Sequence, residues 1–116
     1  MTDVSEQAVT VRYEGGNAQT ELWGGAQANF VVSGDGEHQH EVAVLLPEAV
    51  ASYLAQTLGR DDSAEFHMVA AREAGAAYLE SLLKAGKHIA PFLMLARAEL
   101  DGDAGLLATV KARLHA

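Results

Sequence analysis

Two histidines placed two residues apart, His38 and His40, are the clearest candidates for chemistry in the sequence. Residues 37–46 alternate in the manner of a β-strand, so both side chains are expected on the same face, about 7 Å apart. One metal ion could join them if a third ligand came from elsewhere in the fold. We therefore treat His38 and His40 as a candidate metal site, with two solvated histidines near a strand end as the alternative.

Two further histidines lie in the second half of the chain. His67 is expected in the first turn of a helix, where the helix dipole disfavours a positive charge and so favours the neutral ring. His88 follows Lys87 in an expected loop. If either histidine met the first pair, a site of imidazoles without thiolates would suit zinc, nickel or copper better than magnesium or calcium.

Other signatures of catalysis are missing from the sequence. The chain has no cysteine, which excludes thiolate zinc sites, iron–sulfur clusters and cysteine nucleophiles. No serine lies in a Gly-x-Ser-x-Gly turn, and the glycine pairs fall between expected strands without the lysine of a phosphate-binding loop. The carboxylates of Asp61-Asp62 and Asp101-Gly102-Asp103 stand at expected helix starts, where capping explains them. The sequence therefore predicts no cofactor and no catalytic residue.

Acidic side chains are concentrated in the first half of the chain. Of the 116 residues, 16 are acidic and 8 are Lys or Arg, which gives a formal net charge of −8. Residues 1–50 carry eight acidic residues against Arg12 alone, a net charge of −7, so the net charge of residues 51–116 is only −1. Binding to nucleic acids or anionic membranes needs Lys and Arg, so we expect neither. The expected acidic surface includes Glu14, Glu21, Glu37 and Glu41.

The elements that would position these side chains follow from a change of periodicity near residue 46. Before it, four alternating runs with glycine-rich turns predict a four-stranded antiparallel β-meander over residues 8–46. These strands are expected at 8–14, 18–23, 27–33 and 37–46. After it, apolar residues recur at helical spacing, which predicts three to four helices packed on one face of the sheet. These helices are expected at about 47–58, 64–85, 91–100 and 104–115.

The chain is expected to form a single α+β domain over residues 1–116, in which residues 1–7 are a disordered N-terminus. The segment expected as the third helix, 91–100, follows Ile89 and is apolar on all sides up to Ala96. Such a helix must be covered on more than one face, and a second copy of the chain could supply that cover. We therefore expect a homodimer with contacts through Phe92, Leu93, Leu95 and Leu107.

These features favour a small, acidic, non-enzymatic interaction protein that is homodimeric. We expect a cytoplasmic location, because the sequence shows no secretory signal and no apolar run of the roughly 18 residues that a membrane span needs. One alternative is a ligand- or metal-binding module, or a small enzyme, with a pocket between sheet and helices near His38 and His40. Another is an inhibitor or immunity-type protein that binds a basic partner through its acidic sheet.

Overall fold

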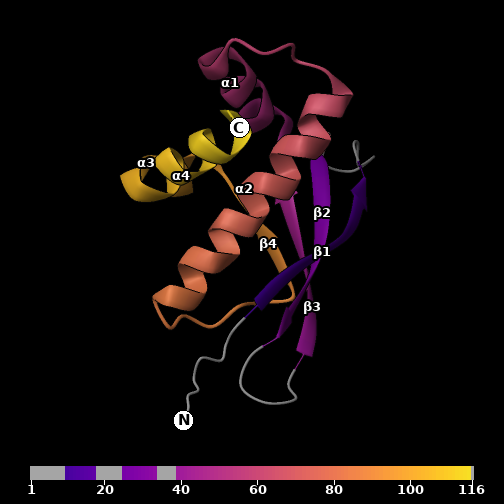
Figure 1. The fold of residues 1–116 in the computed structure, drawn as a ribbon, viewed down its shortest axis with the longest axis vertical. Helices are drawn as coiled ribbons and strands as arrows, with labels where there is room; N and C mark the ends of the chain where they lie inside the picture. The colour runs from indigo at the N-terminus through magenta and orange to yellow at the C-terminus, as the bar shows by residue number, and fades with distance from the viewer. Residues whose placement is uncertain (1–9, 18–24, 34–38, 116) are drawn as a thin grey trace.

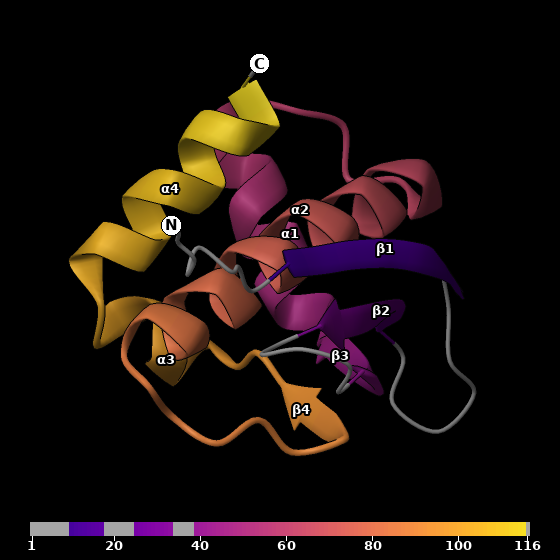
Figure 2. The ribbon, with the colours of Figure 1, turned by 60° about the horizontal axis from the view of Figure 1, so that its bottom comes forward.

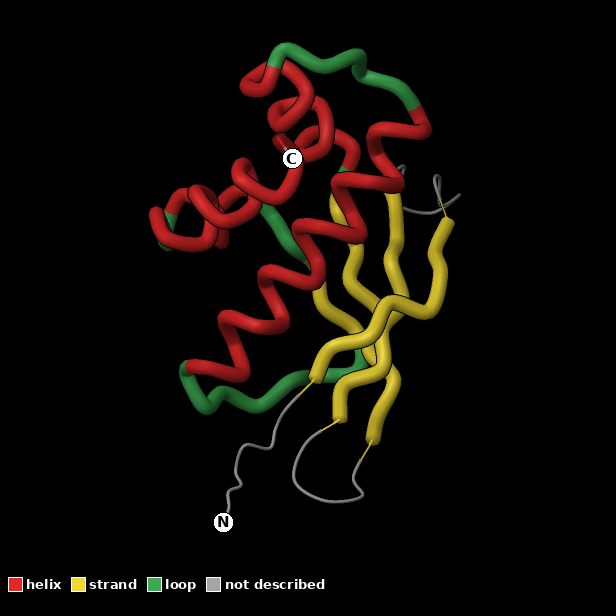
Figure 3. The backbone as a smooth tube through the Cα atoms, viewed as in Figure 1, coloured by secondary structure: helices red, strands yellow, loops and turns green. Residues whose placement is uncertain are grey.

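The computed structural model describes residues 10–17, 25–33 and 39–115 and shows an α+β fold (Figure 1). Four strands form one sheet in the order β1-β2-β3-β4. The strands are β1 (Thr10–Asn17), β2 (Ala26–Ser33), β3 (Gln39–Leu46) and β4 (Phe92–Met94). The helices are α1 (Glu48–Leu58), α2 (Ala64–Lys84), α3 (Arg97–Asp101) and α4 (Ala104–His115). All four helices lie on the same side of the sheet, which confirms the predicted layering (Figures 2 and 3).

The antiparallel part of the described sheet is a meander, as predicted, but it has three strands, and β1 pairs directly with β2 where a strand at 18–23 was expected between them. β1 pairs with β2 and β2 with β3, both antiparallel, whereas β4 pairs with β3 in parallel. The strand predicted at 18–23 lies outside the described residues, as do residues 1–7. The fourth strand of the described sheet comes instead from the second half of the chain, so the sheet is mixed rather than wholly antiparallel.

The prediction of one helix over residues 91–100 is wrong for the first part of that segment. Residues Phe92–Met94 form β4, and only Arg97–Asp101 are helical. The backbone of this segment bonds to β3 at both ends, because the Ala43 amide donates to the Pro91 carbonyl and the Leu95 amide donates to the Leu45 carbonyl, at 2.9 and 2.8 Å. These bonds to a neighbouring strand replace the helical bonds that the sequence pattern suggested.

The core lies between the sheet and α2, and a glycine lets them approach closely. The inward-facing residues of β2 and β3, such as Phe30 and Val44, are almost fully buried. A Cβ at Gly75 of α2 would lie 2.9 Å from Cε1 of Phe30 and 3.4 Å from the Val44 Cβ. On its β1 side, the Phe30 ring meets Tyr13 edge to face, with centroids 5.8 Å apart. α2 therefore rests directly on the middle of the sheet.

The other three predicted helices agree with the structure to within a residue at each end. α1 ends at Gly59, whose φ of 68° is a left-handed conformation that glycine adopts without strain. The Ser63 hydroxyl caps α2 by accepting from the Phe66 amide, and an Asp103 carboxylate oxygen accepts from the Leu106 amide at the start of α4. The cap at Asp103 agrees with the sequence analysis, whereas Ser63, rather than Asp61 or Asp62, caps α2.

Within the helical layer, charged side chains help to hold α4 against α2. Arg113 of α4 donates to Glu73 and to Glu80 of α2, at 3.0 and 3.2 Å. Arg72 also donates to Glu73. Burial alone would raise the pKa of Glu73, but the hydrogen bonds from Arg113 and Arg72 outweigh it and lower that pKa.

Among the described helices, none is long and apolar enough to cross a membrane.

Candidate interaction surface

The face of the sheet that points away from the helices, here called the outer face, is the main surface that the described helices leave uncovered (Figure 2). Side chains alternate along each strand, so the cross-strand register assigns residues to this face. One row across the sheet runs from Gly15 through Asn29 and Ala43 to Phe92. Two large apolar side chains on this face are exposed, Phe92 at 45% and Met94 at 40%.

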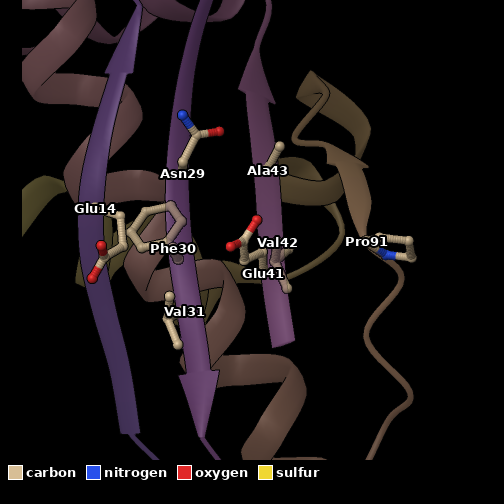
Figure 4. Close-up of a pocket in the computed structure, with 8 residues that line it drawn as sticks. All are labelled: Glu14, Asn29, Phe30, Val31, Glu41, Val42, Ala43 and Pro91. Carbon is tan, nitrogen blue, oxygen red and sulfur yellow. The ribbon is translucent and has the colours of Figure 1, made fainter. Parts of the chain in front are cut away.

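A shallow hollow of about 450 Å³ lies on the outer face (Figure 4). It is bordered by Pro91, the residue that precedes Phe92. Its lining comes from β1, β2 and β3 as well as from Pro91. The residues that line it are Glu14, Asn29, Phe30, Val31, Glu41, Val42, Ala43 and Pro91. The small side chain of Ala43 contributes to the depth of the hollow, because a larger side chain at this position would fill part of it. The hollow thus has an apolar floor and carboxylates near its rim.

A β-bulge in β1 places one of those carboxylates. Tyr13 pairs with Phe30 and Gly15 with Asn29, so Glu14 is an extra residue in its strand. Gly15 has a φ of 119°, a conformation that side chains rarely allow. Glu14 accepts an ion-paired hydrogen bond from Arg12 two residues earlier. The β1 edge of the sheet is therefore irregular and charged.

The edge at β4 has the opposite character. Pro91 and Leu95 bond to β3, so residues 91, 93 and 95 direct their backbone groups towards β3. By the same alternation, the backbone N–H and C=O groups of Phe92 and Met94 point away from the sheet. Within the described part of the chain, no backbone hydrogen bond from another segment satisfies them. This edge therefore combines outward-facing backbone groups with two exposed apolar side chains.

The predicted acidic surface is placed only in part. Glu14 and Glu41 both lie on the outer face beside the hollow (Figure 4). Glu21 and Glu37 lie outside the described residues. With Arg12, the placed charges of this group amount to one base and two acids, a net charge of −1. The structure thus brings two of the four predicted glutamates together.

The candidate metal site stays a prediction. His38 lies outside the described residues, and His40 is an exposed residue of β3 opposite Val32. In the ranges that the structure describes, no three His, Asp or Glu side chains come close enough to hold a metal ion. His88 is exposed in the loop that follows α2.

His67 instead belongs to a small polar cluster between α1 and α2. Its ring is nearly buried and shares a hydrogen bond through Nε2 with the Asp62 carboxylate. The Ser52 hydroxyl donates to the other Asp62 oxygen at 2.7 Å. Hydrogen bonds from Ser52 and then from His67 lower the pKa of Asp62. Because the carboxylate stands between the serine and the histidine, His67 is not placed to take the serine proton as a base would.

The predicted dimer contacts divide into two groups. Phe92 and Leu93 both belong to β4, where Phe92 is exposed and Leu93 packs partly against the core. Leu95 is fully buried in the chain's own core and offers no surface to a partner. Leu107 lies on α4, in the helical layer, and is also partly packed against the core. The structure therefore concentrates the candidate contacts at the β4 edge.

The sequence analysis did not include Met94, an exposed apolar residue of β4, among the candidate contacts, and it did not predict the outward-facing backbone of this edge. Both features arise because residues 92–94 form the strand β4, where the sequence analysis predicted a helix. A run of three residues carries too little alternation to reveal a strand. Comparison of the chain with family models, with curated proteins and with solved structures found no match.

Proposed function

We propose that this chain is a non-enzymatic interaction protein that binds an extended polypeptide strand at its β4 edge. The observation that carries the proposal is the combination at Phe92 and Met94 of exposed apolar side chains with backbone groups directed away from the sheet. Strand addition to an open edge uses these two components, since the backbone gives affinity and alternate side chains give specificity. A cytoplasmic location is part of this proposal.

The contrast between the two sheet edges supports this assignment. Folded proteins protect an exposed edge with charged residues, prolines or bulges. β1 has two of these features, the bulge at Glu14 and the charge of Arg12 with Glu14. Phe92, Leu93 and Met94 carry no charge, and Pro91 directs its backbone towards β3 rather than towards the free edge. A sheet with one protected edge, and an opposite edge that the described residues leave unprotected, is the arrangement expected of a docking site.

Binding of a basic partner through the acidic sheet remains a second candidate. Glu14 and Glu41 flank the hollow on the outer face, as that function requires. Glu14 is already paired with Arg12, however, and the pair contributes no net charge. The described part of the outer face therefore supports strand binding more strongly than charge recognition.

Photo-cross-linking in cells that express the full chain tests the proposed function. A photoreactive benzoylphenylalanine replaces Phe92, whose ring it resembles, and cross-linked peptides are sequenced by mass spectrometry. We expect position 92 to cross-link to one short stretch of an identified polypeptide. The same amino acid at Gln56, an exposed position of α1 in the helical layer, is the matched control.

The proposal also predicts how the cross-link responds to the backbone. In a chain that carries Met94→Pro, the outward N–H of residue 94 is lost while the bonds of residues 91 and 95 to β3 remain. We expect this second change to abolish the cross-link from position 92. Equal cross-linking from positions 92 and 56, or a cross-link that survives Met94→Pro in a folded chain, would contradict strand binding at this edge.

A further inference from the structure

We infer that the strand bound at the β4 edge is β4 of a second copy of this chain, in antiparallel orientation about a two-fold axis at Leu93. This inference rests on the proposed function and names its partner. The result is a homodimer in which two four-stranded sheets join into one continuous sheet.

The first observation concerns the backbone N–H and C=O groups of β4 that point away from the sheet and have no partner within the described part of the chain. They belong to Phe92 and Met94, which are symmetrically placed on either side of Leu93. A two-fold axis at Leu93 sets Phe92 of one chain opposite Met94 of the other, and the reverse. Residues opposite each other whose backbone groups face one another exchange two hydrogen bonds. The two pairs would therefore satisfy all the outward N–H and C=O groups of both β4 strands.

The side chains are self-complementary in the same arrangement. Phe92 and Met94 lie on the outer face, so each aromatic ring would stand beside the thioether of the other chain. Sulfur–aromatic contacts of this kind are favourable, and directly opposed side chains are the closest neighbours across a strand pair. On the helix side, Leu93 would meet its own copy next to the two cores. The Phe-Leu-Met sequence thus offers an apolar neighbour to each of its own residues.

Charge raises no obstacle to this pairing. The three residues of β4 are uncharged, and a two-fold axis perpendicular to the sheet keeps the two β1 edges, with their Arg12 and Glu14 charges, at the outer ends of the joined sheet. A heterologous partner would need to supply apolar side chains at the same two-residue spacing. The second copy already has them.

The strand is only three residues long, which sets the expected strength. Four backbone hydrogen bonds with a few apolar contacts make an interface at the small end of the range for specific complexes. We therefore expect a reversible dimer with a dissociation constant of roughly 0.01 to 1 mM. Sedimentation velocity across roughly this concentration range should show the mass rising from that of one chain to that of two.

Charge complementation tests the antiparallel register. Because position 92 of one chain faces position 94 of the other, we expect Phe92→Glu alone and Met94→Lys alone to be monomeric, since each buries an unpaired charge. A mixture of the two variants should form a heterodimer, in which the introduced opposite charges meet at one pair and the original residues meet at the other. Gln56→Glu, with the same charge change at an exposed site of α1, should dimerise as the original chain does.

Each outcome supports or overturns the inference. Far-ultraviolet circular dichroism first shows that the variants are folded, and a Phe92→Ser and Met94→Ser pair replaces any variant that is not. A chain that is monomeric at about 1 mM overturns the homodimer. So does a dimer that both charged variants leave intact, or a mixture that fails to recover it. If the cross-link from position 92 leads to a different protein, the homodimer is wrong and the proposed strand binding stands. If position 92 gives no cross-link at all, both the homodimer and the proposed strand binding are wrong.

Discussion

At the scale of single residues, Asp62 has the most distinctive environment in the described structure. Its carboxylate accepts from the Ser52 hydroxyl of α1 and shares a hydrogen bond with the His67 ring of α2. Asp62 lies in the link between these helices, so the contacts fix the link to both of them. The hydrogen bonds favour the ionised carboxylate and lower the pKa of Asp62 below its usual value of 3.8.

We expect Ser52→Ala to raise the pKa of Asp62 towards 3.8, because the Ser52 hydrogen bond is the largest cause of its lowering. Nuclear magnetic resonance of the Asp62 carboxyl carbon during an acid titration measures the midpoint directly. Ser81→Ala, a change elsewhere on α2, is the control and should leave that midpoint in place. A midpoint that Ser52→Ala does not move would show that this hydrogen bond is absent in solution.

The same lowering has a consequence for stability. A carboxyl group whose pKa is lower in the folded chain stabilises the fold above its unfolded pKa and loses that contribution as the pH falls through the folded value. We expect Asp62→Asn to reduce the free energy of unfolding near neutral pH, and the difference from the original chain to vanish as the pH falls below 3.8. Urea denaturation of both proteins at a series of pH values checks this. A difference that persists at the lowest pH would assign the effect to something other than ionisation.

Residue-scale features were predicted unevenly from the sequence. The caps at Ser63 and Asp103 follow from local patterns, because each side chain bonds to the backbone three residues ahead. The partner of His67 could not be predicted in this way. Asp62 lies five residues before it, and Ser52 lies on another helix, so the cluster depends on how α1 and α2 pack.

At the scale of elements, the close approach of α2 to the sheet depends on Gly75. We expect Gly75→Ala to lower the free energy of unfolding by about 1 to 2 kcal/mol, because the added methyl group would crowd the buried Phe30 ring by more than its helix propensity returns. Gly105→Ala is the matched control in α4, where the nearest atom to an added Cβ is an Asp103 oxygen at 3.4 Å. We expect it to be neutral or stabilising by up to about 1 kcal/mol. Chemical denaturation would contradict the packing if both substitutions had the same effect.

A second prediction at this scale concerns the ion pair between Glu73 of α2 and Arg113 of α4. Glu73 and Arg113 have side chains exposed by 23% and 33%, so their ion pair is partly shielded from water. A double-mutant cycle with Glu73→Gln and Arg113→Gln should show a coupling energy of about 0.5 to 1 kcal/mol. Arg97 and Asp101, a more exposed pair within α3, provide the comparison and should couple more weakly. Equal coupling energies would mean that partial burial does not strengthen the Glu73 pair.

β4 shows where prediction of the elements failed. The antiparallel strands and three helices carry enough periodicity to be assigned, because each spans several turns or alternations. The segment after Ile89 is apolar on every side, and Pro91 suits the first turn of a helix, so its sequence is compatible with both structures. Pairing with β3, which is about fifty residues away in the chain, decides between them. No local pattern reports such a partner.

At the scale of the whole molecule, the proposed dimer depends on backbone bonds and apolar contacts rather than on charge. We expect its dissociation constant to change by less than about threefold between roughly 0.05 and 0.5 M salt, because salt screens only charged interactions strongly. Sedimentation velocity at both salt concentrations measures it. Binding of a basic protein to the acidic residues should instead weaken by more than about tenfold over this range. A dimer that dissociates in high salt would indicate an electrostatic interface.

The bulge at Glu14 and Gly15 has a consequence for the number of chains in the assembly. A sheet with two open edges can add subunits without end, and such growth leads to fibrils. Here the irregular, charged β1 strand blocks one end of each sheet, while joining two β4 strands uses up the other. Assembly would therefore be self-limiting at two copies. Removal of the bulge by deletion of Glu14 would open a route to polymerisation and amyloid-like aggregation.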